Sequence, residues 1–318
     1  ANTVRVERNV RGSGCIGVTL GEEPAAVWLS AHADICSYLT MLHNGRGYTV
    51  VPFCSHGARP GRRAAVALDM PHGDGPLAHL AEGEMVTGED GSILFECDRT
   101  DLPTWTRVVH HLPARWERDT DRIYGFFDNQ GGSASILLAA RALSHVRANV
   151  YVAVNDEEEG PVTTGNTAFA RASRRLLHRT PPHLVPNLVV VTDGHSQENF
   201  VEVGQTGQFG KGALYNGMGN GAKGSVTPPH HLPFLAGLST ALKGRGIDFI
   251  EDTSYVGRSD DISYIHYTQN VLRFGAGGAY AHFDKPPFVH CSDQVHLVKV
   301  FVLYALIAQD PEWQADYY

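Results

Sequence analysis

Three short apolar runs, each followed closely by a histidine or an acidic residue, constrain the fold of this chain more than any other feature. They occupy residues 27–30, 149–154 and 187–191. Runs of this length without a polar face are typical of central strands that are covered on both sides of a sheet. The runs therefore predict a chain of the α/β class.

Segments with helical periodicity alternate with these strands, and their apolar residues recur at three- and four-residue spacing. The predicted helices span residues 133–146, 168–178, 233–243 and 294–308. The expected fold is α/β, with a mixed, mostly parallel sheet flanked by helices. Residues 1–37 and 122–318 form its predicted catalytic domain.

Residues 38–121 follow a different pattern, because short β-rich pieces are separated there by glycine, proline and aspartate turns. The pieces lie at residues 48–53, 64–68 and 92–96. This pattern predicts an inserted small β-rich lid domain over residues 38–121, which is expected to take part in oligomerisation.

The composition of the chain limits the classes of partner that it is expected to bind. The formal net charge of −8 argues against nucleic acid or an anionic membrane, since both select for clustered lysine and arginine. The N-terminal residues lack the apolar region of a secretory signal, and no apolar run reaches the roughly 18 residues of a membrane span. The five cysteines are odd in number and form no CxxC pair. A cytoplasmic protein is expected.

Ligand-type side chains stand at the ends of the predicted strands. His32 and Asp34 follow the first run, Asp128 follows residues 123–127, Glu157 and Glu158 follow the second run, and Asp193 follows the third. Ligands bind at the carboxyl ends of strands in open α/β sheets. Two zinc-like ions that share one carboxylate need about five ligands of the His, Asp and Glu types, and His290 completes such a set.

These motifs, in order along the chain, resemble those of the M42 family of metallo-aminopeptidases. The matching segments are Ala31-His32-Ala33-Asp34, Asp128-Asn129, Glu157-Glu158-Glu159-Gly160, Asp193 and His290. The resemblance implies that His32, Asp128 and Asp193 hold one metal ion, and that Asp128, Glu158 and His290 hold the other. It also implies that Glu157 is the general base and that Asp34 orients His32. The two ions would be Zn, with Co or Mn as alternatives.

Two assignments have alternatives. If the acidic run is shifted by one residue, Glu158 becomes the base and Glu159 the ligand; Gly160 aligns with the family glycine and favours the first register. His290 competes with His282, His296 and Tyr280. The roles of Asp260, His195 and Cys291 stay open, and for Asp260 a helix cap is as good an interpretation as a place near the site.

The resemblance implies an aminopeptidase that removes the N-terminal residue of short peptides with a water shared by two metals. The same constellation would serve a deacylase or amidohydrolase that acts on a small amide metabolite. A catalytically silent homologue used for binding is the third alternative. The partners are a short peptide or small amide and further copies of this chain, because a homo-oligomer is expected.

Overall fold

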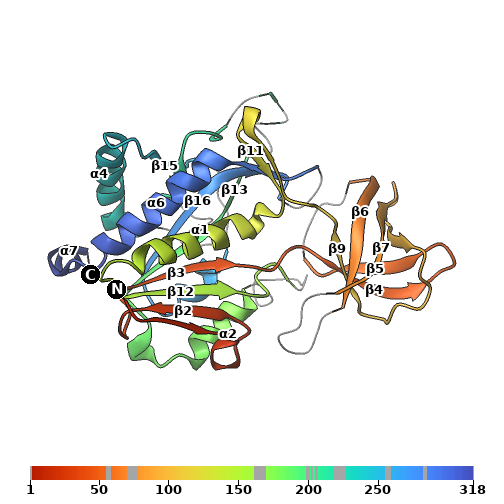
Figure 1. The fold of residues 1–318 in the computed structure, drawn as a ribbon, viewed down its shortest axis with the longest axis horizontal. Coiled ribbons are helices and arrows are strands. Elements are labelled where there is room, and N and C mark those ends of the chain that lie inside the picture. The colour runs from red at the N-terminus through yellow and green to blue at the C-terminus, as the bar shows by residue number, and fades with distance from the viewer. Residues whose placement is uncertain are drawn as a thin grey trace.

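The computed structural model describes residues 2–54, 59–69, 78–160, 170–197, 201, 203–204, 207–217, 227–254, 259–281 and 285–317. Two bodies are visible in Figure 1, a large sheet covered by helices and a smaller β-barrel beside it. Both termini lie at the end of the sheet that faces away from the barrel (Figure 1). None of the described helices is both long and apolar enough to cross a membrane.

The large sheet has eleven strands, and its central strands run parallel. Their order from one edge is β1 (Val4–Glu7), β2 (Ile16–Leu20), β12 (Val150–Asn155), β3 (Val27–His32), β13 (Leu188–Ser196), β16 (Asn270–Ala279), β17 (Phe288–His290), β11 (Arg122–Tyr124) and β10 (Arg115–Glu117), with β14 (Ala213–Tyr215) and β15 (Phe249–Glu251) off this path. Every residue of β3 is buried, as expected for a strand covered on both faces.

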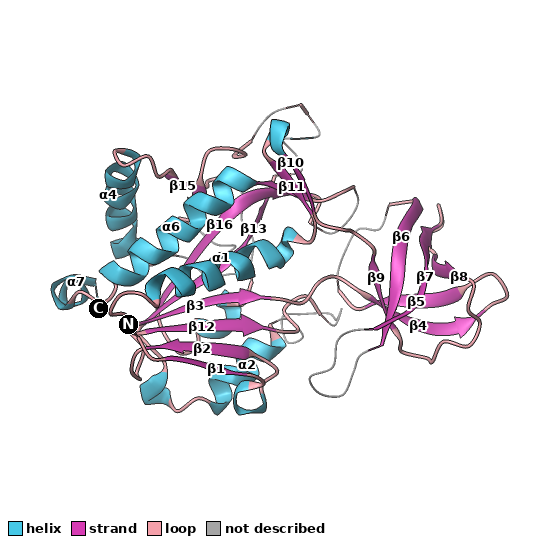
Figure 2. Cartoon of the chain, in the orientation of Figure 1, coloured by secondary structure: helices cyan, strands magenta, loops and turns pink. Residues whose placement is uncertain are grey.

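Helices cover both faces of this sheet (Figure 2). The first face carries α1 (Phe127–Leu143), α4 (Leu232–Lys243) and α6 (Cys291–Ile307), which share one apolar core with the sheet. The opposite face carries α2 (Arg171–Arg179) and α5 (Asp261–Tyr264). The remaining helical elements are α7 (Pro311–Tyr317), η1 (Val10–Gly12), η2 (Arg118–Thr120), η4 (Pro182–Leu184) and η5 (Pro229–His231).

Six antiparallel strands close the barrel, and it has an apolar core of its own around Tyr48, Met85 and Phe95. Its strands are β4 (Tyr38–His43), β5 (Tyr48–Pro52), β8 (Ile93–Cys97), β7 (Ala78–Thr87), β6 (Gly61–Asp69) and β9 (Arg107–His110). Closure leaves no open edge except at the strand ends. The arrowheads of β3 and β12 point toward the barrel in Figure 1, so the barrel faces the carboxyl edge of the sheet.

The predicted fold class is confirmed, since a mixed sheet with parallel central strands is flanked by helices and accompanied by a small β-domain. The barrel strands run from residue 38 to residue 110, whereas β10 and β11 pair with each other at the far edge of the large sheet. The predicted lid domain extends to residue 121, and this range also includes β10, which belongs to the large sheet. Residues 168 and 169 of the second predicted helix lie outside the described residues.

The packing of α1 on the sheet generates a first prediction. Ile136 of α1 is fully buried in the core that α1 shares with the sheet, whereas Leu137, one residue later, is 42% exposed. Ile136→Ala should lower the free energy of unfolding by about 2–5 kcal/mol, because it leaves a cavity in the core. Leu137→Ala is the matched control and should change it by less than about 1 kcal/mol. Equal losses, measured by urea denaturation, would contradict the packing described here.

Candidate metal centre

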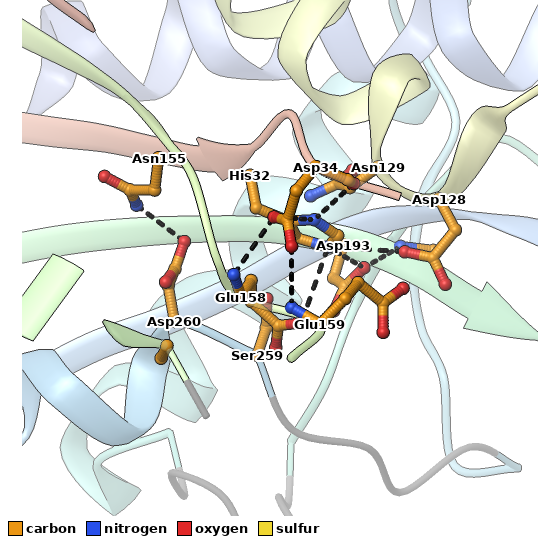
Figure 3. A network of polar contacts seen from close by, with 12 residues as sticks. His32, Asp34, Asp128, Asn129, Asn155, Glu158, Glu159, Asp193, Ser259 and Asp260 are labelled. Atoms are coloured by element: carbon orange, nitrogen blue, oxygen red, sulfur yellow. Dashed lines mark hydrogen bonds and ion pairs between the residues drawn. The ribbon is translucent and has the colours of Figure 1, made fainter. Parts of the chain in front are cut away.

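His32 is the centre of a cluster of acidic side chains at the carboxyl edge of the sheet (Figure 3). It is the last residue of β3, and its ring is buried. Its Nε2 atom lies 3.3 Å from Asp128 Oδ1, 3.6 Å from Asp193 Oδ1 and 3.9 Å from Glu158 Oε2. Side chains from the loop after β12, the start of α1 and the interior of β13 therefore meet at one imidazole nitrogen.

The Asp34 carboxylate contacts both the second nitrogen of the His32 ring and the backbone of the acidic run. Its Oδ1 atom lies 3.4 Å from His32 Nδ1. The two carboxylate oxygens also accept hydrogen bonds of 3.0 Å from the backbone N–H groups of Glu158 and Glu159. Asp34 therefore lies between the His32 ring and the segment that carries Glu158 and Glu159.

Asp128 is delivered by the first residues of α1, where its backbone is still extended (φ −95°, ψ 99°). The next residue, Asn129, ties this start to β13 by donating a 2.6 Å hydrogen bond to the Thr192 carbonyl. The Asn129 side-chain oxygen also accepts from the Gly132 N–H at 3.1 Å. A Cβ at Gly132 would overlap that oxygen, so glycine is required at this turn.

Asp193 lies on β13 and is 7% exposed. Its Oδ1 atom accepts a 2.7 Å hydrogen bond from the Gly194 N–H. Its Oδ2 atom lies 3.8 Å from Arg273 Nη2, a buried guanidinium on the neighbouring strand β16. The parallel pairing of β13 with β16 and β3 therefore places Asp193 beside His32.

The three glutamates of the acidic run lie in different surroundings. The Glu157 backbone has a positive φ of 53°, and its carboxylate pairs with Arg175 at 2.7 Å and Arg171 at 3.7 Å. Glu158 and Glu159 are instead buried, at 3% and 5% exposure. Ligand atoms of His32, Asp128 and Glu159 all lie within 4.8 Å of one another, which would suit a metal ion. Glu158 and Glu159 therefore lie at the His32 cluster, whereas Glu157 is held by the arginines of α2.

The structure does not bring His290 into this cluster of described residues. The His290 ring stacks on Phe209, with centroids 5.6 Å apart, and its Nδ1 lies 4.0 Å from Asp121 Oδ2. Of its competitors, His296 accepts a 2.7 Å hydrogen bond from the Asp248 N–H, and Tyr280 contacts Lys285. His282 lies outside the described residues.

Asp260 stands behind the cluster and is fully buried. It accepts a 2.6 Å hydrogen bond from the amide of Asn155 at the end of β12, as Figure 3 shows. Its side chain makes no capping bond to α5, so the helix-cap interpretation does not describe its contacts. Glu159 is the ligand of the shifted register in the sequence analysis, whereas no residue pattern pointed to Asn155.

His195 and Cys291 have other contacts in this structure. His195 is buried on β13, and its Nδ1 lies 3.0 Å from Asp252 Oδ2. Burial lowers the pKa of His195, although Asp252 opposes that shift. Cys291 is partly buried and lines an apolar cavity at the start of α6, and burial raises the pKa of its thiol. A thiol with a raised pKa is a poor nucleophile near neutral pH.

The electrostatics of the cluster fit a divalent cation. Burial raises the pKa of Glu158 well above its usual range; nearby Glu159, Asp193 and Asp260 raise it further, while His32 opposes the shift. Burial also raises the pKa of Asp260 to about 6. For His32, burial lowers the pKa, but the surrounding carboxylates raise it more. A set of imidazole and carboxylate donors with excess negative charge is the chemistry that binds zinc, cobalt or manganese.

No protein-family profile matches the sequence, and no curated protein is similar to it. Solved structures do match. A TET aminopeptidase from the marine-sediment archaeon Thaumarchaeota archaeon SCGC AB-539-E09 has a TM-score of 0.76 at 13% identity, and the match covers 99% of this chain and 90% of that chain. For the TET1 peptidase of Pyrococcus horikoshii these values are 0.70, 16%, 96% and 89%. For an M18-family aminopeptidase of Thermotoga maritima they are 0.63, 12%, 96% and 86%.

At these identities the likeness establishes the fold, which extends over nearly the whole chain. The resemblance noted in the sequence motifs is thereby confirmed at the level of fold. The barrel is part of that shared architecture, because the matches include it.

Asp34 provides a test of the geometry. Asparagine can accept from only one of the two N–H groups of Glu158 and Glu159 and turns its own N–H₂ toward the other. Asp34→Asn should therefore weaken zinc binding by about 10- to 100-fold, as for other residues that hold metal ligands in place. The measurement is a calorimetric zinc titration, with Asp90→Asn in an exposed barrel turn as control. Equal affinities of both variants would refute the role of Asp34.

Proposed function

We propose that this protein is a metal-dependent aminopeptidase that removes the N-terminal residue of short peptides. The observation that carries the proposal is the meeting of His32, Asp128 and Glu159 ligand atoms at the carboxyl edge of the sheet. The proposal is supported by the fold, because the structures that share it include TET and M18 aminopeptidases.

His32, Asp128, Asp193 and Glu159 are the proposed metal ligands. Two ions, with Asp128 between them, are proposed from the number of donors, and His290 is the proposed fifth ligand. His290 immediately precedes α6, whose first turn contacts the middle of α1 through a 2.9 Å hydrogen bond from Ser135 to Gln294. When bound, the ions would activate a water molecule and polarise the scissile carbonyl.

The chain's own residues would supply the proton transfers and the orientation. Glu158, held by its backbone bond to Asp34, would take a proton from the attacking water at its carboxylate and pass it to the leaving amine. Asp34 would keep the His32 ring in a fixed orientation.

The test of this function combines metal content with hydrolysis of aminoacyl anilides by protein re-equilibrated with Zn, Co or Mn. About two metals per chain with anilide cleavage is the expected result. Two metals without anilide cleavage, but with hydrolysis of N-acylated substrates, would point to the deacylase alternative. Absence of bound metal under every condition would refute the metal centre.

The register of the acidic run is tested by a matched pair of variants. Glu158→Gln should retain metal and lower kcat by about 10²- to 10⁴-fold, the usual loss when a general base is removed. Glu157→Gln should keep kcat within a few-fold, because its carboxylate is engaged by Arg175 away from His32. The reverse pattern in steady-state kinetics would return the base to Glu157 and the ligand to Glu158.

His290 is tested by metal content alone. His290→Ala should lower the number of bound ions from two to about one if this imidazole is a ligand, since each ion needs at least three protein donors. His296→Ala in the following helix, α6, is the control, because its ring accepts a hydrogen bond from the Asp248 backbone N–H. Two ions in both variants, by elemental analysis, would remove His290 from the site.

A further inference from the structure

A cavity of about 260 Å³ lies near the β1 edge of the large sheet, on the face that carries α2. We call it the edge cavity. The segments η1 and η4 and the residue after α2 form one wall. The sheet forms the other wall, with a row of residues that lie opposite one another on four neighbouring strands, namely Arg5, Thr19, Tyr151 and Trp28.

The Tyr151 hydroxyl is a buried polar group in the sheet wall of the edge cavity. Among the described residues it has no hydrogen-bond partner. Gly17, which also lines the cavity, leaves room for it, because a Cβ there would overlap the hydroxyl oxygen. A buried polar group without a partner destabilises the fold. A polar ligand in the edge cavity would supply the missing hydrogen bond.

Charges of both signs surround this hydroxyl. Burial raises the pKa of Tyr151, Glu7 and Glu23 raise it further, and Arg11 lowers it. All three charged residues line the edge cavity. Glu23 forms an ion pair with Arg5, so these two charges offset each other. Glu7 and Arg11 are the remaining charges of the lining.

Glu7 and Arg11 have no ion-pair partner within the part of the chain that the structure describes. Arg11 donates a 2.6 Å hydrogen bond to the neutral Thr180 hydroxyl, which holds its guanidinium beside the cavity. Glu7 is exposed on β1, and its side chain makes no hydrogen bond to a described residue. One cation and one carboxylate are therefore available to a ligand at the same cavity.

The turn that carries Arg11 has a strained backbone that other residues hold in place. Asn9 and Arg11 have positive φ values of 51° and 50°. Arg179 donates a 2.9 Å hydrogen bond to the Arg11 carbonyl, and the Asn9 side-chain oxygen accepts one of 2.9 Å from the Gly14 N–H. Such strain persists only where the surrounding structure enforces it, and it is concentrated at functional sites. The backbone of Arg11 is thus fixed beside the edge cavity.

The rest of the lining is apolar. Val10, Ala25 and Trp28 are buried there, and Leu184 lies beside them. The volume of about 260 Å³ is slightly below that of the usual pockets for drug-sized ligands, about 300–1,000 Å³. A small molecule that carries both charges and an apolar group would match this lining.

We propose that the edge cavity binds a free α-amino acid with an apolar side chain, whose carboxylate is recognised by Arg11 and whose ammonium group is recognised by Glu7. Arg11 supplies a planar fork that suits a carboxylate. The Tyr151 hydroxyl can donate to that carboxylate, and the apolar lining receives the side chain.

The edge cavity is separate from the candidate metal centre. Trp28 precedes His32 by four residues on β3, which corresponds to about 13 Å along the strand. A free amino acid is also what the proposed peptidase would release as a product. The inference does not depend on that activity, because it rests on the lining of the edge cavity alone.

The experiment is a calorimetric titration of the zinc-loaded protein with leucine, leucinamide and N-acetylleucine. Leucinamide lacks the carboxylate, and N-acetylleucine lacks the ammonium group. The wild type should bind leucine at least about tenfold more tightly than either analogue, the effect of one charge-assisted hydrogen bond. Glycine should also bind more weakly than leucine, because it leaves the apolar lining unfilled.

Variants assign each preference to one side chain. Arg11→Met should abolish the preference for leucine over leucinamide, and Glu7→Gln should abolish the preference over N-acetylleucine, each leaving the other preference in place. Tyr151→Phe, which removes only the hydroxyl, should weaken leucine binding by a few-fold. Arg245→Met is the matched control, because Arg245 also donates to a neutral oxygen, the Ala241 carbonyl, outside the edge cavity.

Binding of leucine at the metal centre would give the same preferences in every variant, because neither Arg11 nor Glu7 belongs to that centre. Preferences that are unchanged in both Arg11→Met and Glu7→Gln would therefore overturn the proposal. Equal binding of all four ligands by the wild type, or no binding of leucine up to about 10 mM, would overturn it as well. Absence of anilide cleavage would contradict the proposed peptidase function alone.

Discussion

The gathering of carboxylates around one buried imidazole is the interaction on which the rest of the structure depends. Asp128, Glu158 and Asp193 each approach His32 Nε2 within 3.9 Å. Like charges this close repel one another, and burial makes their ionisation more costly. A cation at the centre would offset that repulsion, so the arrangement makes physical sense as a metal centre. Asp34 holds the remaining geometry through two peptide N–H groups.

The barrel borders the candidate metal centre on a second side. Because the barrel has an apolar core of its own, it does not depend on the sheet for its burial. Gly160, directly after the acidic run, abuts the Phe53 carbonyl of the barrel so closely that a Cβ would overlap it. The segment that carries Glu158 and Glu159 is thus confined from both sides, by Asp34 and by the barrel.

Much of this architecture could be predicted because it depends on local patterns. Uniformly apolar runs identified β3, β12 and β13, and the acids after them marked the correct edge of the sheet. The acidic run could not be resolved in the same way, since three adjacent glutamates look alike in sequence. Their separation depends on Arg175, which engages Glu157 from α2, eighteen residues further along the chain. No local sequence pattern predicts such a partner.

The sequence by itself determined the class of fold, the order of its elements and the residue types that meet at the carboxyl edge, because periodicity and strand ends are encoded locally. Only the tertiary structure decided which side chains converge. It set Glu159 beside Asp128, joined Asp260 to Asn155 and placed Arg11 and Tyr151 in one cavity. The members of each pair are far apart in the sequence, and the adjacent glutamates differ only in the direction that the backbone gives their side chains. The packing of separate elements decides both the pairing and that direction.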